Sequence, residues 1–129
     1  MLKKRLGTEA IERSWNYDCV DDYFKIPSTL TILESCEKIG PGALWGTKEL
    51  KEVVILNGCK NIGEFAFKDC YNLEKVEIPE SVEWIEEGAF CCCKKAVITL
   101  KKAISELRIG KNAFNYCKSI EDVEKETRN

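Results

Sequence analysis

The fold is decided by a six-residue stretch, Ile62-Gly63-Glu64-Phe65-Ala66-Phe67, which recurs at three other places in the chain. The starts of the four copies are separated by 23, 23 and 24 residues, and the other three read Ile39-Gly40-Pro41-Gly42-Ala43-Leu44, Ile85-Glu86-Glu87-Gly88-Ala89-Phe90 and Ile109-Gly110-Lys111-Asn112-Ala113-Phe114. Self-similarity at a fixed period of this length is typical of a solenoid, in which each coil buries a face against the next. The sequence therefore predicts a repeat protein, and solenoids of this kind usually bind other macromolecules.

Between these copies the repeat continues with a regular pattern of apolar residues. The stretch from Leu73 to Ile78 alternates apolar and polar residues, which predicts a short strand with Val76 and Ile78 pointing inward. The stretch from Glu64 to Cys70 has a spacing compatible with one or two helical turns. In the unit that begins at Ile85 the register is ambiguous, because Ile98 and Leu100 suit the inward positions only if the strand starts one residue early.

The aligned units resemble the BspA-type branch of the leucine-rich repeat superfamily, whose pattern runs Ile-Gly-x-x-Ala-Phe-x-x-Cys-x-x-Leu-x-x-Val-x-Ile-Pro-x-Ser-Val. The stretch Cys70-Tyr71-Asn72-Leu73-Glu74-Lys75-Val76-Glu77-Ile78-Pro79-Glu80-Ser81-Val82 follows this pattern almost position for position. The resemblance implies an α/β repeat fold, a short right-handed leucine-rich-repeat solenoid. Each coil of about 23 residues would hold one short parallel strand, with helical or irregular turns on the other side.

The resemblance and the fading of the pattern at both ends divide the chain into three segments. Residues 28–120 are expected to form the solenoid of four to five units, begun by a half-unit with Leu30, Ile32 and Cys36 one period before their counterparts. Residues 1–27 are expected to form an N-terminal cap, with a short helix from Thr8 to Trp15, because a terminal coil otherwise exposes its core. Residues 121–129 are charged and are expected to form a polar C-terminal cap or tail.

Composition argues against several classes of function. The formal net charge is −2 with acids and bases interspersed, so neither nucleic acid nor a membrane surface is an expected partner. No apolar run approaches the roughly 18 residues of a membrane span, and the N-terminus does not read as a secretory signal. We therefore expect an intracellular (cytoplasmic) location, and the resemblance, which extends to proteins of large DNA viruses, implies a virion location as the other option.

The chain contains no histidine, which removes the commonest general base and the commonest metal ligand. The adjacent acids Asp21-Asp22 and Glu86-Glu87 are expected to be solvated rather than catalytic. We expect no enzymatic activity and no cofactor.

Eight cysteines would ordinarily suggest a secreted, disulfide-bonded domain, but their placement follows the repeat. Cys70, Cys93 and Cys117 occupy one site in successive units, which predicts a column of buried, reduced thiols. The run Cys91-Cys92-Cys93 leaves Cys91 and Cys92 at more exposed positions. No Cys-x-x-Cys knuckle is present, so we expect ordinary surface thiols there, and a cysteine-based metal-binding or redox protein is the alternative.

The residues between the inward strand positions must face outward, and they form the candidate partner-binding surface. We predict an apolar patch on the strand face with charged flanks, made of Thr31, Leu33, Glu52, Val54, Leu56, Lys75 and Glu77. Pro79 is expected to face outward with them. Leu33 and Leu56 could instead fold over the strand ends as part of the core. Trp45 and Trp84 also fall at outward positions and form the alternative partner-binding site, since exposed tryptophans are good interface anchors.

These observations together favour a non-catalytic protein–protein interaction module. The module would act as an adaptor or as a structural subunit of a larger assembly, including a virion.

Overall fold

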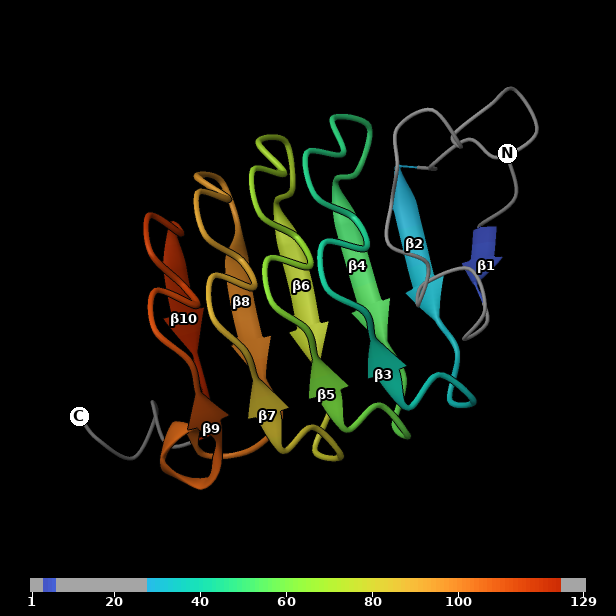
Figure 1. The fold of residues 1–129 in the computed structure, drawn as a ribbon, viewed down its shortest axis with the longest axis vertical. Helices are drawn as coiled ribbons and strands as arrows, with labels where there is room; N and C mark the ends of the chain where they lie inside the picture. The colour runs from blue at the N-terminus through green and yellow to red at the C-terminus, as the bar shows by residue number, and fades with distance from the viewer. Residues whose placement is uncertain (1–3, 7–27, 124–129) are drawn as a thin grey trace.

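The computed structural model describes residues 4–6 and 28–123, which form a solenoid of parallel strands (Figure 1). Its first sheet has six strands in the order β1-β2-β4-β6-β8-β10, which span Lys4–Leu6, Thr29–Ile32, Glu52–Ile55, Lys75–Ile78, Val97–Leu100 and Ser119–Glu121. The second sheet has four strands in the order β3-β5-β7-β9, which span Lys38–Ile39, Asn61–Ile62, Trp84–Ile85 and Arg108–Ile109. The parallel-strand solenoid predicted from the repeat is confirmed.

The six-stranded sheet forms because equivalent residues of successive coils pair directly. Val53 lies opposite both Leu30 and Val76, and Val76 lies opposite Ile98. Burial alternates along β2, β4, β6 and β8, so every second residue of each strand places its side chain in the core. Val76 and Ile78 are buried, as the period-two pattern predicts, and Leu73 before the strand is buried too.

The ambiguous unit between Ile85 and Arg108 adopts the early register. In β8 both Ile98 and Leu100 are buried, and Val97 pairs with Lys75. The loop between β8 and β9 accommodates the extra residue and contains the 3₁₀ helix Ile104–Glu106. The core packing of β8 therefore decides where the strand starts, and the loop takes up the remaining length.

The expectation of one strand per coil is incomplete, because coils of the repeat contribute a second, two-residue strand. These short strands carry the first isoleucine of each repeat, and Ile39, Ile62 and Ile85 are buried while the residue before each is not. Figure 1 shows the two rows of arrows, with β3, β5, β7 and β9 forming the second row. The core lies between the two sheets and the turns that connect them.

The helical turns expected from Glu64 to Cys70 are absent, and this prediction is wrong. Phe65 and Asp69 have φ angles of 56° and 60°, which are left-handed and interrupt a right-handed helix. The same two positions are left-handed in the other coils, at Gly42 and Gly46, Gly88 and Cys92, and Asn112 and Tyr116. Among residues 4–6 and 28–123 the 3₁₀ segment Ile104–Glu106 is the helical element.

Hydrogen bonds between coils explain why turns replace the helix. The N–H groups of Phe65, Phe67 and Asp69 donate to the carbonyl oxygens of Glu87, Ala89 and Cys91 in the next coil, over 2.9, 2.7 and 3.0 Å. Their neighbours Ala66, Lys68 and Cys70 donate within the coil instead. Every second N–H group thus points along the solenoid axis, a direction that a helix perpendicular to that axis cannot provide.

The phenylalanines of the repeat form a column through the core. The rings of Phe67 and Phe90 lie 5.0 Å apart and nearly parallel, and those of Phe90 and Phe114 lie 5.9 Å apart. Phe67 and Phe90 are fully buried, whereas Phe114 is partly exposed because it lies in the last described coil. Burial of the rings is thus complete only inside the array. No polar or charged residue is buried in the described part of the chain.

Some expectations concern features that this structure does not test. The helix from Thr8 to Trp15 and the acidic pair Asp21-Asp22 lie outside the described residues. Strand β1 (Lys4–Leu6) pairs with β2 from within the segment assigned to the cap. The boundaries at residues 27 and 120, and the right-handed course of the coil, stay predictions.

Candidate partner-binding surface

The outer face of the six-stranded sheet brings most of the predicted partner-binding residues into two rows. Thr31 lies opposite Val54, and Val54 lies opposite Glu77, so these residues from β2, β4 and β6 form one row. Glu52 lies opposite Lys75 in the other. None of the five is buried, which agrees with their outward positions.

Leu33 and Leu56 follow directly after β2 and β4 and are half-buried. Neither belongs to the buried core cluster nor to the partly buried apolar residues packed against it. The backbone continues the sheet pairing at this point, since the Leu56 N–H donates to the Ile32 carbonyl oxygen over 3.0 Å. These leucines therefore stand at the rim of the strand face and do not close the core.

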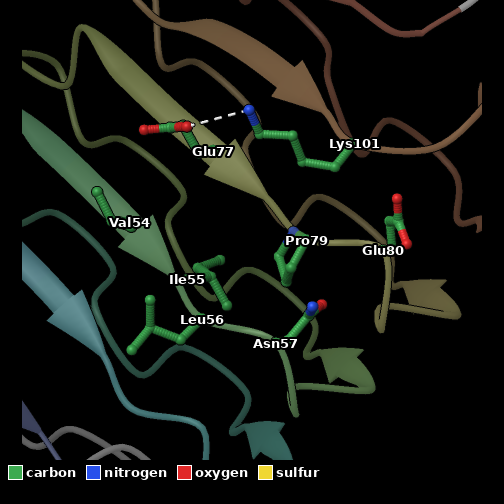
Figure 2. Close-up of a pocket in the computed structure, with 8 residues that line it drawn as sticks. All are labelled: Val54, Ile55, Leu56, Asn57, Glu77, Pro79, Glu80 and Lys101. Carbon is green, nitrogen blue, oxygen red and sulfur yellow. Dashed lines mark ion pairs between the residues drawn. The ribbon is translucent and has the colours of Figure 1, made fainter.

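An open pocket of about 320 Å³ lies where β4, β6 and β8 end (Figure 2). It is lined by Val54, Ile55, Leu56, Asn57, Glu77, Pro79, Glu80 and Lys101. Figure 2 shows Val54 and Leu56 on one side and the pair Glu77 and Lys101 on the other. Of the predicted surface residues, Val54, Leu56 and Glu77 line this pocket, whereas Thr31, Leu33, Glu52 and Lys75 do not.

Pro79 was expected to face outward, and this expectation is wrong, because Pro79 is buried. It follows β6 as Leu56 follows β4, and its ring lines the pocket beside Asn57. A proline lacks the N–H group that pairing would need at this place, so it suits a strand end. Pro79 thus contributes an apolar surface to the pocket although little of its side chain is exposed to solvent.

Lys101, Glu80 and Asn57 are pocket residues that the sequence pattern did not reveal. Lys101 directly follows Leu100, as Leu56 directly follows Ile55, so the register of β8 was the signal that could have placed it. Its ammonium group lies 3.3 Å from a carboxylate oxygen of Glu77. Both side chains remain partly exposed, so this ion pair contributes at most about 1 kcal/mol and can be exchanged for a partner's charges.

The two tryptophans of the alternative site lie on different elements and have different surroundings. Trp45 is 40% exposed, in a turn between β3 and β4, and its ring lies 5.5 Å from that of Phe65. The Trp45 Nε1 donates to a carboxylate oxygen of Asp69 over 3.2 Å, and the Lys68 ammonium lies over the ring. These contacts hold Trp45 against the next coil, which contains Phe65, Lys68 and Asp69.

Trp84 is half-buried in β7, and the guanidinium of Arg108 lies 4.0 Å above its ring centroid. Trp84 pairs with Asn61 on one side and with Arg108 on the other. The structure does not bring Trp84 together with Trp45 into one surface comparable to the strand face, because each tryptophan packs on its own neighbours.

The column cysteines make one repeated hydrogen bond along the solenoid. The thiols of Cys70, Cys93 and Cys117 donate to the carbonyl oxygens of Leu44, Phe67 and Phe90 in the preceding coil, over 3.1, 3.0 and 3.2 Å. Cys70 and Cys93 are buried, while Cys117, at the end of the column, is half-buried. The structure contains no disulfide bond within its described ranges.

The surroundings of Cys59, Cys93 and Cys117 raise the pKa values of these three thiols. Burial raises the pKa of Cys117 to about 12, and burial also raises the pKa of Cys59 to about 12. The thiol contact with Cys70, together with burial, raises the pKa of Cys93. Because the thiolate is the reactive form, a raised pKa keeps these cysteines in the unreactive thiol form near neutral pH.

We expect Cys91 and Cys92 to be alkylated before the column cysteines when the folded protein is treated with iodoacetamide near neutral pH. Both thiols are partly exposed, whereas Cys70 and Cys93 are buried and need local opening of the solenoid to react. Peptide mapping of a labelling time course measures the order, and the same reaction in denaturant provides the control. Equal rates for Cys70 and Cys92 in the folded protein would contradict the burial of the column.

No group of three or more cysteine, aspartate or glutamate side chains that could hold a metal ion is found in the described segments. No helix in these segments is long and apolar enough to cross a membrane.

The sequence was compared with those of known protein families. The family described as BspA-type leucine-rich repeat region matches residues 9–127 with six copies of its repeat. The chain belongs to the BspA-type leucine-rich repeat family. The match extends beyond residues 28–120 at both ends. Searches of curated proteins and of solved structures found no similar protein. Leucine-rich repeats commonly mediate protein–protein interactions.

Proposed function

We propose that this BspA-type repeat protein is a non-catalytic scaffold that binds another protein across the outer face of its six-stranded sheet. The observation that carries the proposal is the pocket at the ends of β4, β6 and β8, where Val54, Leu56 and Pro79 meet the ion pair between Glu77 and Lys101. An apolar hollow beside charged groups is the usual form of a site for a partner's anchoring side chain.

The binding surface extends from this pocket along the sheet. Thr31 and Leu33 continue the apolar surface over β2, and Glu52 and Lys75 supply charges at its flank. An apolar partner side chain would enter the pocket, and charged partner groups would exchange with Glu77 and Lys101. In this role the protein acts as an adaptor or as a structural subunit of a larger assembly, intracellular or within a virion.

The test is a double substitution, Val54→Lys with Leu56→Glu, which leaves the net charge unchanged. Both side chains lie outside the core, so we expect the melting temperature to stay close to that of the wild type. Capture of the partner from the native source should be lost, because two charges now occupy the apolar rim. Quantitative mass spectrometry of the proteins retained by each variant measures the effect.

A matched control reverses a different pair of surface charges. Lys60→Glu with Glu83→Lys exchanges an exposed ion pair before β5 and β7, also without changing net charge, and should retain the partner. Unfolding of the Val54/Leu56 variant would place these residues in the core. A folded variant that still retains the partner would move the interface elsewhere, with Trp45 and Trp84 as the next positions to change.

A further inference from the structure

The thiols of Cys91 and Cys92 lie against each other at the surface, with their Sγ atoms 3.3 Å apart. Successive side chains of an extended chain point to opposite sides. Here Cys92 has a φ angle of 69°, and this left-handed conformation turns its side chain to the same side as that of Cys91. Both cysteines are half-buried, and neither belongs to the core cluster. The two sulfur atoms therefore form an accessible dithiol.

Hydrogen bonds from three directions hold the backbone of this dithiol. The Asp69 N–H of the preceding coil donates to the Cys91 carbonyl oxygen over 3.0 Å, and the Cys92 N–H donates to the Asn115 carbonyl oxygen of the next coil over 2.8 Å. The Cys91 N–H also donates to the Gly88 carbonyl oxygen. Because the coils on both sides fix the dipeptide, the two thiols are organised before any ligand arrives, which lowers the entropic cost of binding.

The distance between the sulfur atoms selects the kind of ligand. A centre with bonds of about 2.3 Å to each sulfur spans the 3.3 Å gap with an angle of about 90° between the bonds. A linear two-coordinate ion would need the sulfur atoms much farther apart. A tetrahedral zinc ion would need further protein ligands, and no cluster of three such side chains is present among the described residues. A soft, pyramidal, trivalent centre fits both the angle and the two sulfur ligands.

We propose that Cys91 and Cys92 form a chelating site for trivalent arsenicals. The reaction with an arsine oxide forms two As–S bonds and breaks two S–H bonds and the arsenic–oxygen bond. The two thiol protons leave with the oxygen as water, and no oxidation state changes. The second bond forms within one molecule, so the high effective concentration of the neighbouring thiol makes the chelate resist competing single thiols. This site is independent of the partner-binding surface on the sheet.

The test uses phenylarsine oxide and the intact mass of the full-length protein, reduced beforehand. We expect the wild type to retain a single arsenical after washing with excess 2-mercaptoethanol and to release it to a small dithiol. Cys91→Ser and Cys92→Ser should each lose the retained arsenical in the monothiol wash, since one thiol cannot chelate. Cys117→Ser is the matched control, a partly exposed thiol of the buried column, and should retain the arsenical as the wild type does.

Several outcomes would overturn the proposal. Retention by Cys91→Ser or Cys92→Ser would place the arsenical on other thiols. Loss from Cys117→Ser at an unchanged melting temperature would show that the site needs a third sulfur. Release from the wild type by 2-mercaptoethanol, as fast as from the two serine variants, would show two independent thiols and no chelate.

Discussion

Replacement of Phe67 by alanine should lower the free energy of unfolding by about 3–5 kcal/mol, a large part of the stability of an ordinary domain. Phe67 is fully buried, and its ring stacks on that of Phe90 at 5.0 Å in the centre of the array. The loss removes both burial and the contact through which one coil stabilises the next. Urea denaturation followed by circular dichroism measures the change.

Two further substitutions should destabilise the protein less than Phe67→Ala does. Phe114→Ala should cost less than Phe67→Ala, because Phe114 is partly exposed at the end of the column. Tyr71→Ala, in the same coil as Phe67, should have little effect, because Tyr71 is 47% exposed and its ring packs at the surface, with the ammonium of Lys94 5.8 Å from the ring centroid. A Phe67→Ala protein with an unchanged melting temperature would show that the phenylalanine column is not the core.

Gly58→Ala should also destabilise the protein severely. Gly58 has a φ angle of 127°, a conformation that costs residues other than glycine about 1–3 kcal/mol. A Cβ atom there would also lie 2.2 Å from the carbonyl oxygen of Glu34 in the preceding coil. The obstacle is backbone, so relief requires the two coils to separate. The melting temperature and the urea midpoint of the variant measure the loss.

Gly42→Ala is the matched control for this substitution. Gly42 has a φ angle of 65°, but the nearest atom to an added Cβ is Cε3 of Trp45 at an ordinary 3.6 Å. Phe65 and Asn112 occupy the equivalent position of later coils at similar angles, so we expect a loss of only about 1–2 kcal/mol. Equal losses of stability for Gly42→Ala and Gly58→Ala would mean that the close approach to the Glu34 carbonyl oxygen does not destabilise the Gly58→Ala variant.

The inward residues of the solenoid could be predicted from the repeat because their signal is local and periodic. Leu73, Val76 and Ile78 recur in register with their counterparts, and a residue that recurs once per coil must stack on its equivalents. The repeat left the start of β8 ambiguous, and the structure selects the early register, in which Ile98 and Leu100 reach the core. The outward positions of Val54 and Glu77 then followed from the alternation of the strand.

The turns could not be predicted in the same way. Glu64 to Cys70 has a helix-compatible spacing, and Phe65 carries no local signal for a left-handed conformation; Asp69, a residue type that tolerates this conformation, is only a weak signal for it. The bonds that favour the turn go to Glu87, Ala89 and Cys91, which lie in the next coil. The gain from three hydrogen bonds between coils outweighs the cost of two left-handed residues, and neither quantity can be obtained from one repeat alone.

The sequence by itself determined the period, the parallel-strand solenoid, the family and the row of residues that faces outward from each strand. Only the tertiary structure decided where those rows form a pocket, because Lys101 reaches Glu77 through the register of β8 and Pro79 packs down between strand ends. It also decided that Cys91 and Cys92 face each other, through the left-handed turn at Cys92. Repetition specifies which residues stack, whereas contacts between unlike residues of neighbouring coils depend on backbone angles that the coils impose on one another.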